Sequence, residues 1–139
     1  MSRFVLDASI VLTWCFPDEN SPLADHVISL FKNGGSALVP SFWPHEVLNA
    51  LLMGEKRKRI SQEAVESFLS DLAILPISLD VLPAQAIFEK VQHLSREHSL
   101  TAYDAAYLDL AVENRLALAT LDESLITACK KSGTPLIEL

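Results

Sequence analysis

Cysteine, long apolar runs and basic charge are all scarce in this sequence. It has two cysteines, Cys15 and Cys129, and their spacing matches no metal-binding motif, which excludes a metal site built on thiolates. Both fall in predicted helices, so we expect buried free thiols rather than a disulfide. No apolar run reaches the ~18 residues of a membrane span, and no basic stretch followed by an apolar signal region opens the chain. We therefore expect a cytoplasmic protein with no membrane partner.

Basic residues are outnumbered by acidic ones, 11 against 18, and the formal net charge is −7. A general nucleic-acid-binding protein carries a basic patch, so the overall charge argues against that class. The same balance suits a protein that gathers acidic side chains in one site and neutralises them with cations.

The sequence does have enough length and apolar content for a folded domain. Of its 139 residues, 50% are hydrophobic and 21% are charged, which is typical of a globular chain rather than a disordered one. A chain of this length can bury a core without disulfides. We expect residues 1–139 to form a single domain.

Predicted strands alternate with predicted helices along the whole chain. Short apolar runs bounded by turn residues predict the strands, and apolar residues at helical spacing predict the helices between them. The alternation predicts an α/β fold with three layers (α/β/α) around a central parallel sheet of about four to five strands. The expected strands cover residues 4–6, 37–39, 74–77, 116–119 and 135–137.

Several expected boundaries depend on proline and on capping residues. The first helix, over residues 8–15, should end near Phe16-Pro17, because proline disfavours helix at the residue before it. Pro76 interrupts the third strand, which is therefore expected at the edge of the sheet. Ser61 is expected to cap one helix and Asp80 to open another.

Four acidic residues occupy similar settings at the ends of predicted elements. Asp7 follows the apolar strand at residues 4–6, and Asp122 follows the strand at 116–119. The carboxyl ends of parallel strands share one edge of a sheet, where ligands bind in open α/β folds. Glu46 and Asp104 each fall in the first turn of a predicted helix that can start at that edge. Carboxylates converging from separate elements, without histidine or cysteine, indicate a site for a hard divalent cation such as Mg²⁺.

Each of these acids also has an ordinary structural explanation. Asp7 and Asp122 could be plain helix caps, worth about 1 kcal/mol each. Thr101 and Asp104 fit a capping box, and Glu46 in a first turn complements the helix dipole. The cation site is favoured because Asp7 and Asp122 interrupt apolar runs, and a buried charge is usually paired or metal-bound.

Other polar and aromatic residues receive weaker assignments. Ser9 and Thr120 each stand two residues from one of the acids and could orient a carboxylate, or could simply bond to local backbone. The basic run Lys56, Arg57, Lys58 and Arg59 is either a solvated helix end or a patch that contacts RNA phosphates. The large aromatic residues are expected in the core or an interface: Trp14, Trp43, Tyr103 and Tyr107.

Four short motifs together resemble the PIN-domain nuclease family, and in particular its VapC-type toxins. They are Val5-Leu6-Asp7-Ala8-Ser9, Pro44-His45-Glu46-Val47-Leu48-Asn49-Ala50-Leu51, Tyr103-Asp104-Ala105-Ala106-Tyr107 and Ala119-Thr120-Leu121-Asp122-Glu123-Ser124-Leu125. The resemblance spans the whole chain, and the order of the motifs is more specific than any one of them.

The resemblance implies a ribonuclease that depends on one or two Mg²⁺ or Mn²⁺ ions. It implies a catalytic cluster of Asp7, Glu46, Asp104 and Asp122, with Ser9 and Thr120 beside it. It also implies a homodimer, and a VapB-like antitoxin whose tail occupies the active-site groove. Many relatives carry an acid or amide where this chain has Ser124, which weakens the expectation of a second metal more than that of the first.

The mechanism that these residues suggest is metal-assisted hydrolysis of RNA phosphodiester bonds. Asp7 and Asp104 would hold one metal, Asp122 would lie near a second, and Glu46 would orient the metal–water network. Two alternatives remain open at this point. One is a non-catalytic RNA- or protein-binding module of the same fold, and the other is a receiver-type signalling domain with an acidic magnesium pocket.

Overall fold

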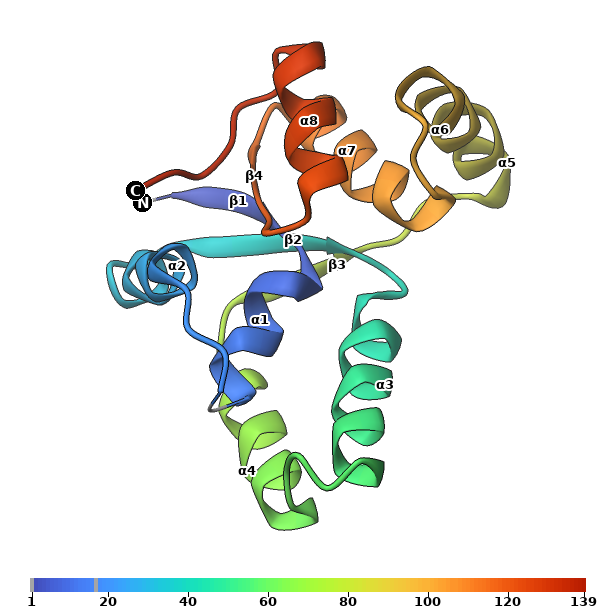
Figure 1. Ribbon diagram of the computed structural model, residues 1–139. Helices are drawn as coiled ribbons and strands as arrows, with labels where there is room; N and C mark the ends of the chain where they lie inside the picture. Colours follow the sequence, from blue (N-terminus) through green and yellow to red (C-terminus); the bar gives the residue numbers. More distant parts are fainter. Residues whose placement is uncertain (1, 17) are drawn as a thin grey trace.

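A four-stranded parallel sheet lies at the centre of the computed structural model, which describes residues 2–16 and 18–139 (Figure 1). The strand order is β3-β2-β1-β4. Arg3 pairs with Ser36 between β1 and β2, and Leu6 pairs with Ala119 between β1 and β4. The strands are β1 (Arg3–Leu6), β2 (Ser36–Pro40), β3 (Ile77–Asp80) and β4 (Ala117–Ala119).

Helices cover both faces of this sheet, which gives the predicted three layers (Figure 1). On one side lie α1 (Ala8–Cys15), α3 (Trp43–Lys56) and α4 (Gln62–Leu72), with α2 (Pro22–Lys32) beside α1. On the other side lie α5 (Ala84–Ala86), the π-helix η1 (Ile87–Val91), α6 (Gln92–His98), α7 (Ala102–Asn114) and α8 (Glu123–Ser132). Helix α7 packs across β1, β2 and β4. None of the helices in the described residues combines the length and the apolar character needed to cross a bilayer.

The position of β1 explains why its sequence is apolar throughout. It lies between β2 and β4, and helices cover both of its faces. Phe4, Val5 and Leu6 are therefore fully buried, as expected for an inner strand of a parallel sheet. The first polar residue after this run, Asp7, stands at the carboxyl edge of the sheet.

Several helices begin at a side-chain cap. Ser21, Ser61 and Thr101 each accept a hydrogen bond from the backbone amide three residues later. The predicted cap at Ser61 is thus confirmed, with a distance of 3.1 Å from Ala64 N to Ser61 Oγ. These bonds satisfy N–H groups that have no partner inside the helix.

The prediction for the third strand was wrong in its boundaries. The strand begins at Ile77, one residue after Pro76, and ends at Asp80, which therefore does not open a helix. Proline has no N–H to give to a ladder, although the Pro76 carbonyl still accepts from Ala37 N. The next helix starts at Ala84, after Pro83. The predicted edge position of this strand is confirmed.

Two other boundaries differ in smaller ways. The expected strand at residues 135–137 is reduced to one parallel bridge between Leu118 and Leu136. Helix α1 ends at Cys15, where the sequence predicted, and Pro17 lies outside the described residues. Cys15 is a half-buried free thiol, and Cys129 is a buried one.

Candidate active site

Asp7 is held at the point where β1 and β4 end side by side. Its backbone amide donates to Ala119 O at 3.0 Å. Its carboxylate is only 5% exposed and makes no capping bond to α1, so the explanation of Asp7 as a plain helix cap was wrong. Instead, Ser9 Oγ and Thr120 Oγ1 both donate to Asp7 Oδ2 at 2.7 Å.

The same two hydroxyl groups bind the loop after β4. Ser9 Oγ accepts from Leu121 N, and Thr120 Oγ1 accepts from Asp122 N, each at 3.0 Å. The loops that follow β1 and β4 are therefore joined through side chains as well as through the sheet. This arrangement fixes the orientation of the Asp7 carboxylate and places Asp122 next to it.

Asp122 combines a structural role with proximity to Asp7. Its Oδ2 accepts from Leu125 N at 2.9 Å, which makes it the cap of α8, as the ordinary explanation predicted. Burial raises the pKa of Asp7, the hydrogen bonds from Ser9 and Thr120 lower it, and the nearby charge of Asp122 raises it again. Asp122 thus contributes charge to the site while holding the start of a helix.

Glu46 reaches the same place from the first turn of α3. Tyr107 Oη donates to Glu46 Oε1 at 2.6 Å and lies 3.4 Å from Ala8 N, the backbone amide that donates to it. Burial raises the pKa of Glu46, and the charges of Asp7 and Asp104 raise it further, against the lowering effect of the Tyr107 bond.

Tyr107 is a site residue that the sequence analysis missed. It is fully buried, as expected of a core aromatic, but its hydroxyl group connects α7 to Glu46 and to the start of α1. Burial and the charges of Asp7 and Glu46 raise its pKa, so the phenol keeps its proton and acts as a donor. Its position three residues after Asp104 was the available signal, because residues at that spacing share a helix face.

Asp104 completes the group from the first turn of α7. Its backbone amide donates to Thr101 Oγ1 at 3.1 Å, which is one half of the predicted capping box. Burial raises the pKa of the Asp104 carboxyl, and the charges of Asp122 and Asp7 raise it further. Each of the four acids therefore lies near enough to at least one other for its charge to matter.

The donor chemistry of this cluster suits a hard divalent cation, because all four side chains offer carboxylate oxygens. Ser9 and Thr120 both donate to Asp7 Oδ2, and Asp122 accepts the capping bond on its own Oδ2. The Oδ1 atoms of Asp7 and Asp122 therefore take no part in these bonds. Within residues 2–16 and 18–139, however, no three Asp, Glu, His or Cys side chains are close enough together to hold an ion as they stand.

The basic run lies away from the acids, at the opposite end of α3. Glu46 and Lys56 are ten residues apart on this helix, which corresponds to roughly 15 Å. Arg59 donates to Asp18 Oδ1 at 3.1 Å and stacks over the Phe16 ring at 4.3 Å. The remaining three basic side chains are exposed at the end of the helix: Lys56, Arg57 and Lys58.

Comparison with known proteins gives related sequences and structures over nearly the whole chain. The PIN domain family matches residues 4–131. Ribonuclease VapC3 from Pyrobaculum aerophilum is 27% identical over 133 residues, which cover 96% of this chain and 99% of that protein.

Solved structures show the same fold at lower sequence identity. PAE2754 from Pyrobaculum aerophilum has a TM-score of 0.69 at 21% identity, and the match covers 91% of this chain and 84% of that one. VapBC2 from Rickettsia felis, bound to a DNA fragment from its promoter, has a TM-score of 0.61 at 14% identity and covers 98% and 97%.

Proposed function

The chain belongs to the PIN domain family, and from that membership we propose that it is a metal-dependent endoribonuclease acting through Asp7, Glu46, Asp104 and Asp122. The observation that supports this most is the state of Asp7. It is a buried carboxylate oriented by two hydroxyl groups, with three other acids around it. The described ion pairs include none to these four residues, so their charge is left for a cation to neutralise.

In this proposal Asp7 and Asp104 would hold the metal, Mg²⁺ or Mn²⁺, and Asp122 would lie near a second ion. When bound, such an ion polarises the phosphodiester and lowers the pKa of a coordinated water. A cation is also needed on electrostatic grounds, because four carboxylates would otherwise repel the RNA backbone. Ser124, exposed near Asp122, offers no carboxylate, so we propose one firmly held ion and a second that enters with the substrate.

The other residues of the site position these ligands. Ser9 and Thr120 fix the rotation of the Asp7 carboxylate, and Tyr107 fixes Glu46. Partners of this kind, one bond behind the ligands, orient ligand oxygens and tune their basicity. We propose that Glu46 orients the water that attacks the phosphorus, since it already accepts a strong hydrogen bond on only one of its two oxygens.

The partners that we propose are supported by similarity to known toxin–antitoxin proteins. One neighbour is a VapBC complex, and a toxin–antitoxin complex from Klebsiella pneumoniae also matches at a TM-score of 0.52 and 17% identity. We propose that this chain is a cytoplasmic toxin, active as a homodimer of one-domain subunits, and inhibited by a cognate VapB-like antitoxin. The exposed residues Lys56, Arg57 and Lys58, and to a smaller degree Arg59, would contact phosphates of the RNA outside the catalytic site.

The test is an RNA cleavage assay with Mg²⁺, with Mn²⁺ and with EDTA. Asp7→Asn and Asp104→Asn should each lower the rate more than about 100-fold, beyond the usual effect of residues that only support a ligand. Asp71→Asn, an exposed acid on α4, is the matched control and should cleave normally. Cleavage by both site variants at close to the wild-type rate would overturn the assignment. RNA binding without cleavage by the wild type would support the non-catalytic alternative instead.

A further inference from the structure

Besides Asp7, the protein has another buried aspartate, Asp109 on helix α7, which the proposed reaction does not use. Asp109 is only 3% exposed and lies within the apolar run of this helix. In the described part of the chain, no hydrogen bond and no ion pair reaches its carboxylate. Its carboxylate oxygens are not among the buried polar atoms that lack a partner in the described residues, so they keep contact with solvent.

Among the charges of the described residues that act on Asp109, Lys90 alone is positive. Burial raises the pKa of Asp109, as do the charges of Glu113 and Asp80, while Lys90 lowers it. Lys90 is engaged elsewhere, because its Nζ lies 3.4 Å from Glu113 Oε2. Two carboxylates thus act against one shared cation, and the surroundings of Asp109 remain electrostatically negative.

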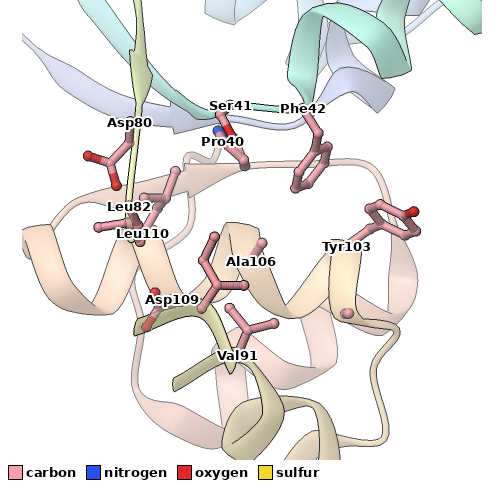
Figure 2. A pocket seen from close by; sticks show the side chains of 12 residues that line it. Pro40, Ser41, Phe42, Asp80, Leu82, Val91, Tyr103, Ala106, Asp109 and Leu110 are labelled. Carbon is pink, nitrogen blue, oxygen red and sulfur yellow. The ribbon is translucent and has the colours of Figure 1, made fainter. Parts of the chain in front are cut away.

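Asp109 lines a pocket that has apolar walls on its other sides. The pocket encloses about 150 Å³ between α7, η1 and the loops that follow β2 and β3. Figure 2 shows Asp80 and Asp109 on one side of it and the rings of Phe42 and Tyr103 on the other. The remaining walls include Leu82, Ile87, Val91 and Leu110. The pocket therefore has an anionic end and an apolar end.

This pocket is separate from the acid cluster. The rings of Phe42 and Tyr103 pack edge to face at 5.2 Å, and those of Phe42 and Tyr107 at 5.8 Å. Phe42 and Tyr103 line the pocket, Tyr107 donates to Glu46, and none of the four acids is among the lining residues. A ligand in the pocket would therefore contact Phe42 and Tyr103 rather than the four acids.

One wall of the pocket is an unusual helix segment. Residues Ile87–Val91 form a π-helical turn, and its first and last residues line the pocket. Such turns are rare in proteins and occur often at functional sites. The irregular backbone is therefore a second feature, independent of Asp109, that coincides with the pocket.

We propose that this pocket binds an organic cation on a short apolar stem, an alkylguanidinium or alkylammonium group such as the arginine or lysine side chain carries. The apolar walls would take the stem, and Asp109 with Asp80 would take the charge. The volume is too small for a drug-sized ligand, which needs roughly 300 Å³ or more. It is close to that of an engineered cavity that holds benzene, and so it fits one side chain or one small amine.

The test uses n-butylguanidinium as the probe and n-butylurea as its neutral counterpart, with binding followed by NMR on ¹⁵N-labelled protein. The cation should bind saturably and shift amide signals of α7 and η1, whereas the urea should bind at least about tenfold more weakly. Equal binding of the two probes would overturn the proposal.

Two variants on one helix locate the cation. Asp109→Asn should weaken binding by about tenfold or more, because the charge-assisted bond is lost. Asp104→Asn makes the same chemical change on α7 at the acid cluster and should leave this binding unchanged. The reverse pattern would place the cation among the proposed catalytic acids and would overturn the proposal, whatever the outcome of the cleavage assay.

A third variant guards against an indirect effect of the charge change. Ala106→Leu adds volume to the pocket wall and keeps Asp109. It should prevent binding of the cation while the protein keeps a cooperative thermal unfolding transition. Undiminished binding by this folded variant would show that the probe lies elsewhere.

The source of the cation is decided by a final pair of probes. Tighter binding of an acetylated and amidated Ala-Arg-Ala peptide than of n-butylguanidinium would identify a protein side chain as the ligand. Tighter binding of the free cation would identify a small amine or guanidine. Either result supports the pocket, and binding of neither probe contradicts it.

Discussion

The molecule contains two buried aspartates, Asp7 and Asp109, with nearly equal exposure and opposite surroundings. Asp7 is 5% exposed and Asp109 is 3% exposed. Asp7 follows a strand at the edge of the sheet and accepts two hydrogen bonds from hydroxyl groups. Asp109 stands in the middle of a helix and accepts none from the described residues. Burial alone therefore does not indicate what a carboxylate does, because hydrogen-bond partners decide whether its orientation is fixed.

Of the changes that test this comparison, removing one hydroxyl partner of Asp7 should cause the largest loss of activity. Thr120→Val keeps the side-chain shape but removes the donor to Asp7 Oδ2, so the carboxylate becomes more like Asp109. We expect cleavage activity or metal affinity to fall by about 10- to 100-fold. Thr13→Val is the control, because that hydroxyl bonds only to Ile10 O of its own helix. Equal activity of the two variants would show that the hydroxyl clamp is unimportant.

Removing the phenol should have an intermediate effect. Tyr107→Phe takes away the donor to Glu46 and leaves the buried ring, so we expect roughly a tenfold loss of cleavage rate, at the lower end for such supporting partners. The loss should fall on kcat more than on KM if Glu46 orients the attacking water. Steady-state kinetics on a short RNA would measure both. A change in stability with unaltered kinetics would restrict Tyr107 to a packing role.

The smallest expected effect is on stability, and there the two aspartates should behave alike. The pKa values of Asp7, Asp104 and Asp109 are all raised, chiefly by burial. The folded chain therefore binds more protons than the unfolded chain between the unfolded and folded pKa values. The free energy of unfolding of metal-free protein should fall as the pH rises through that interval.

Substitutions then separate the acids by their response to Mg²⁺. Asp109→Asn should raise the melting temperature of metal-free protein at pH 7 by about 2–4 °C and keep the further increase that Mg²⁺ gives. Asp104→Asn should also raise it, but the response to Mg²⁺ should shrink. Thermal scans across pH, with and without Mg²⁺, would measure these effects. A lower melting temperature for Asp104→Asn would mean that its contribution to the first turn of α7 outweighs charge repulsion.

The sequence was sufficient to predict the fold, and to predict that Asp7 and Asp122 lie at the same edge of the sheet. An uninterrupted apolar run ending in Asp7 requires an inner strand, and parallel strands bring their carboxyl ends to one edge. Ser9 and Thr120 were noticed because they stand two residues from an acid. The boundaries of β3 were harder, because Pro76 occupies the position before the strand rather than inside it.

Contacts between distant segments could not be predicted from spacing alone. The bond between Tyr107 and Glu46 joins residues 61 positions apart, and it depends on how α3 and α7 pack. Asp109 did carry a signal in the sequence, since it is a charged residue between Leu108 and Leu110. The ends of helices and strands do not point to it, because it lies in the middle of α7.

The two hydroxyl groups beside Asp7 have one further consequence, which concerns where a proton can reside. Ser9 and Thr120 each accept from a backbone N–H, so each must turn its own hydrogen towards Asp7 Oδ2. That oxygen is saturated with incoming hydrogens and has no room for an acidic one. A proton would therefore go to Oδ1, the oxygen that accepts from neither of these hydroxyl groups. Under the proposed function, a cation would compete with a proton for this single atom.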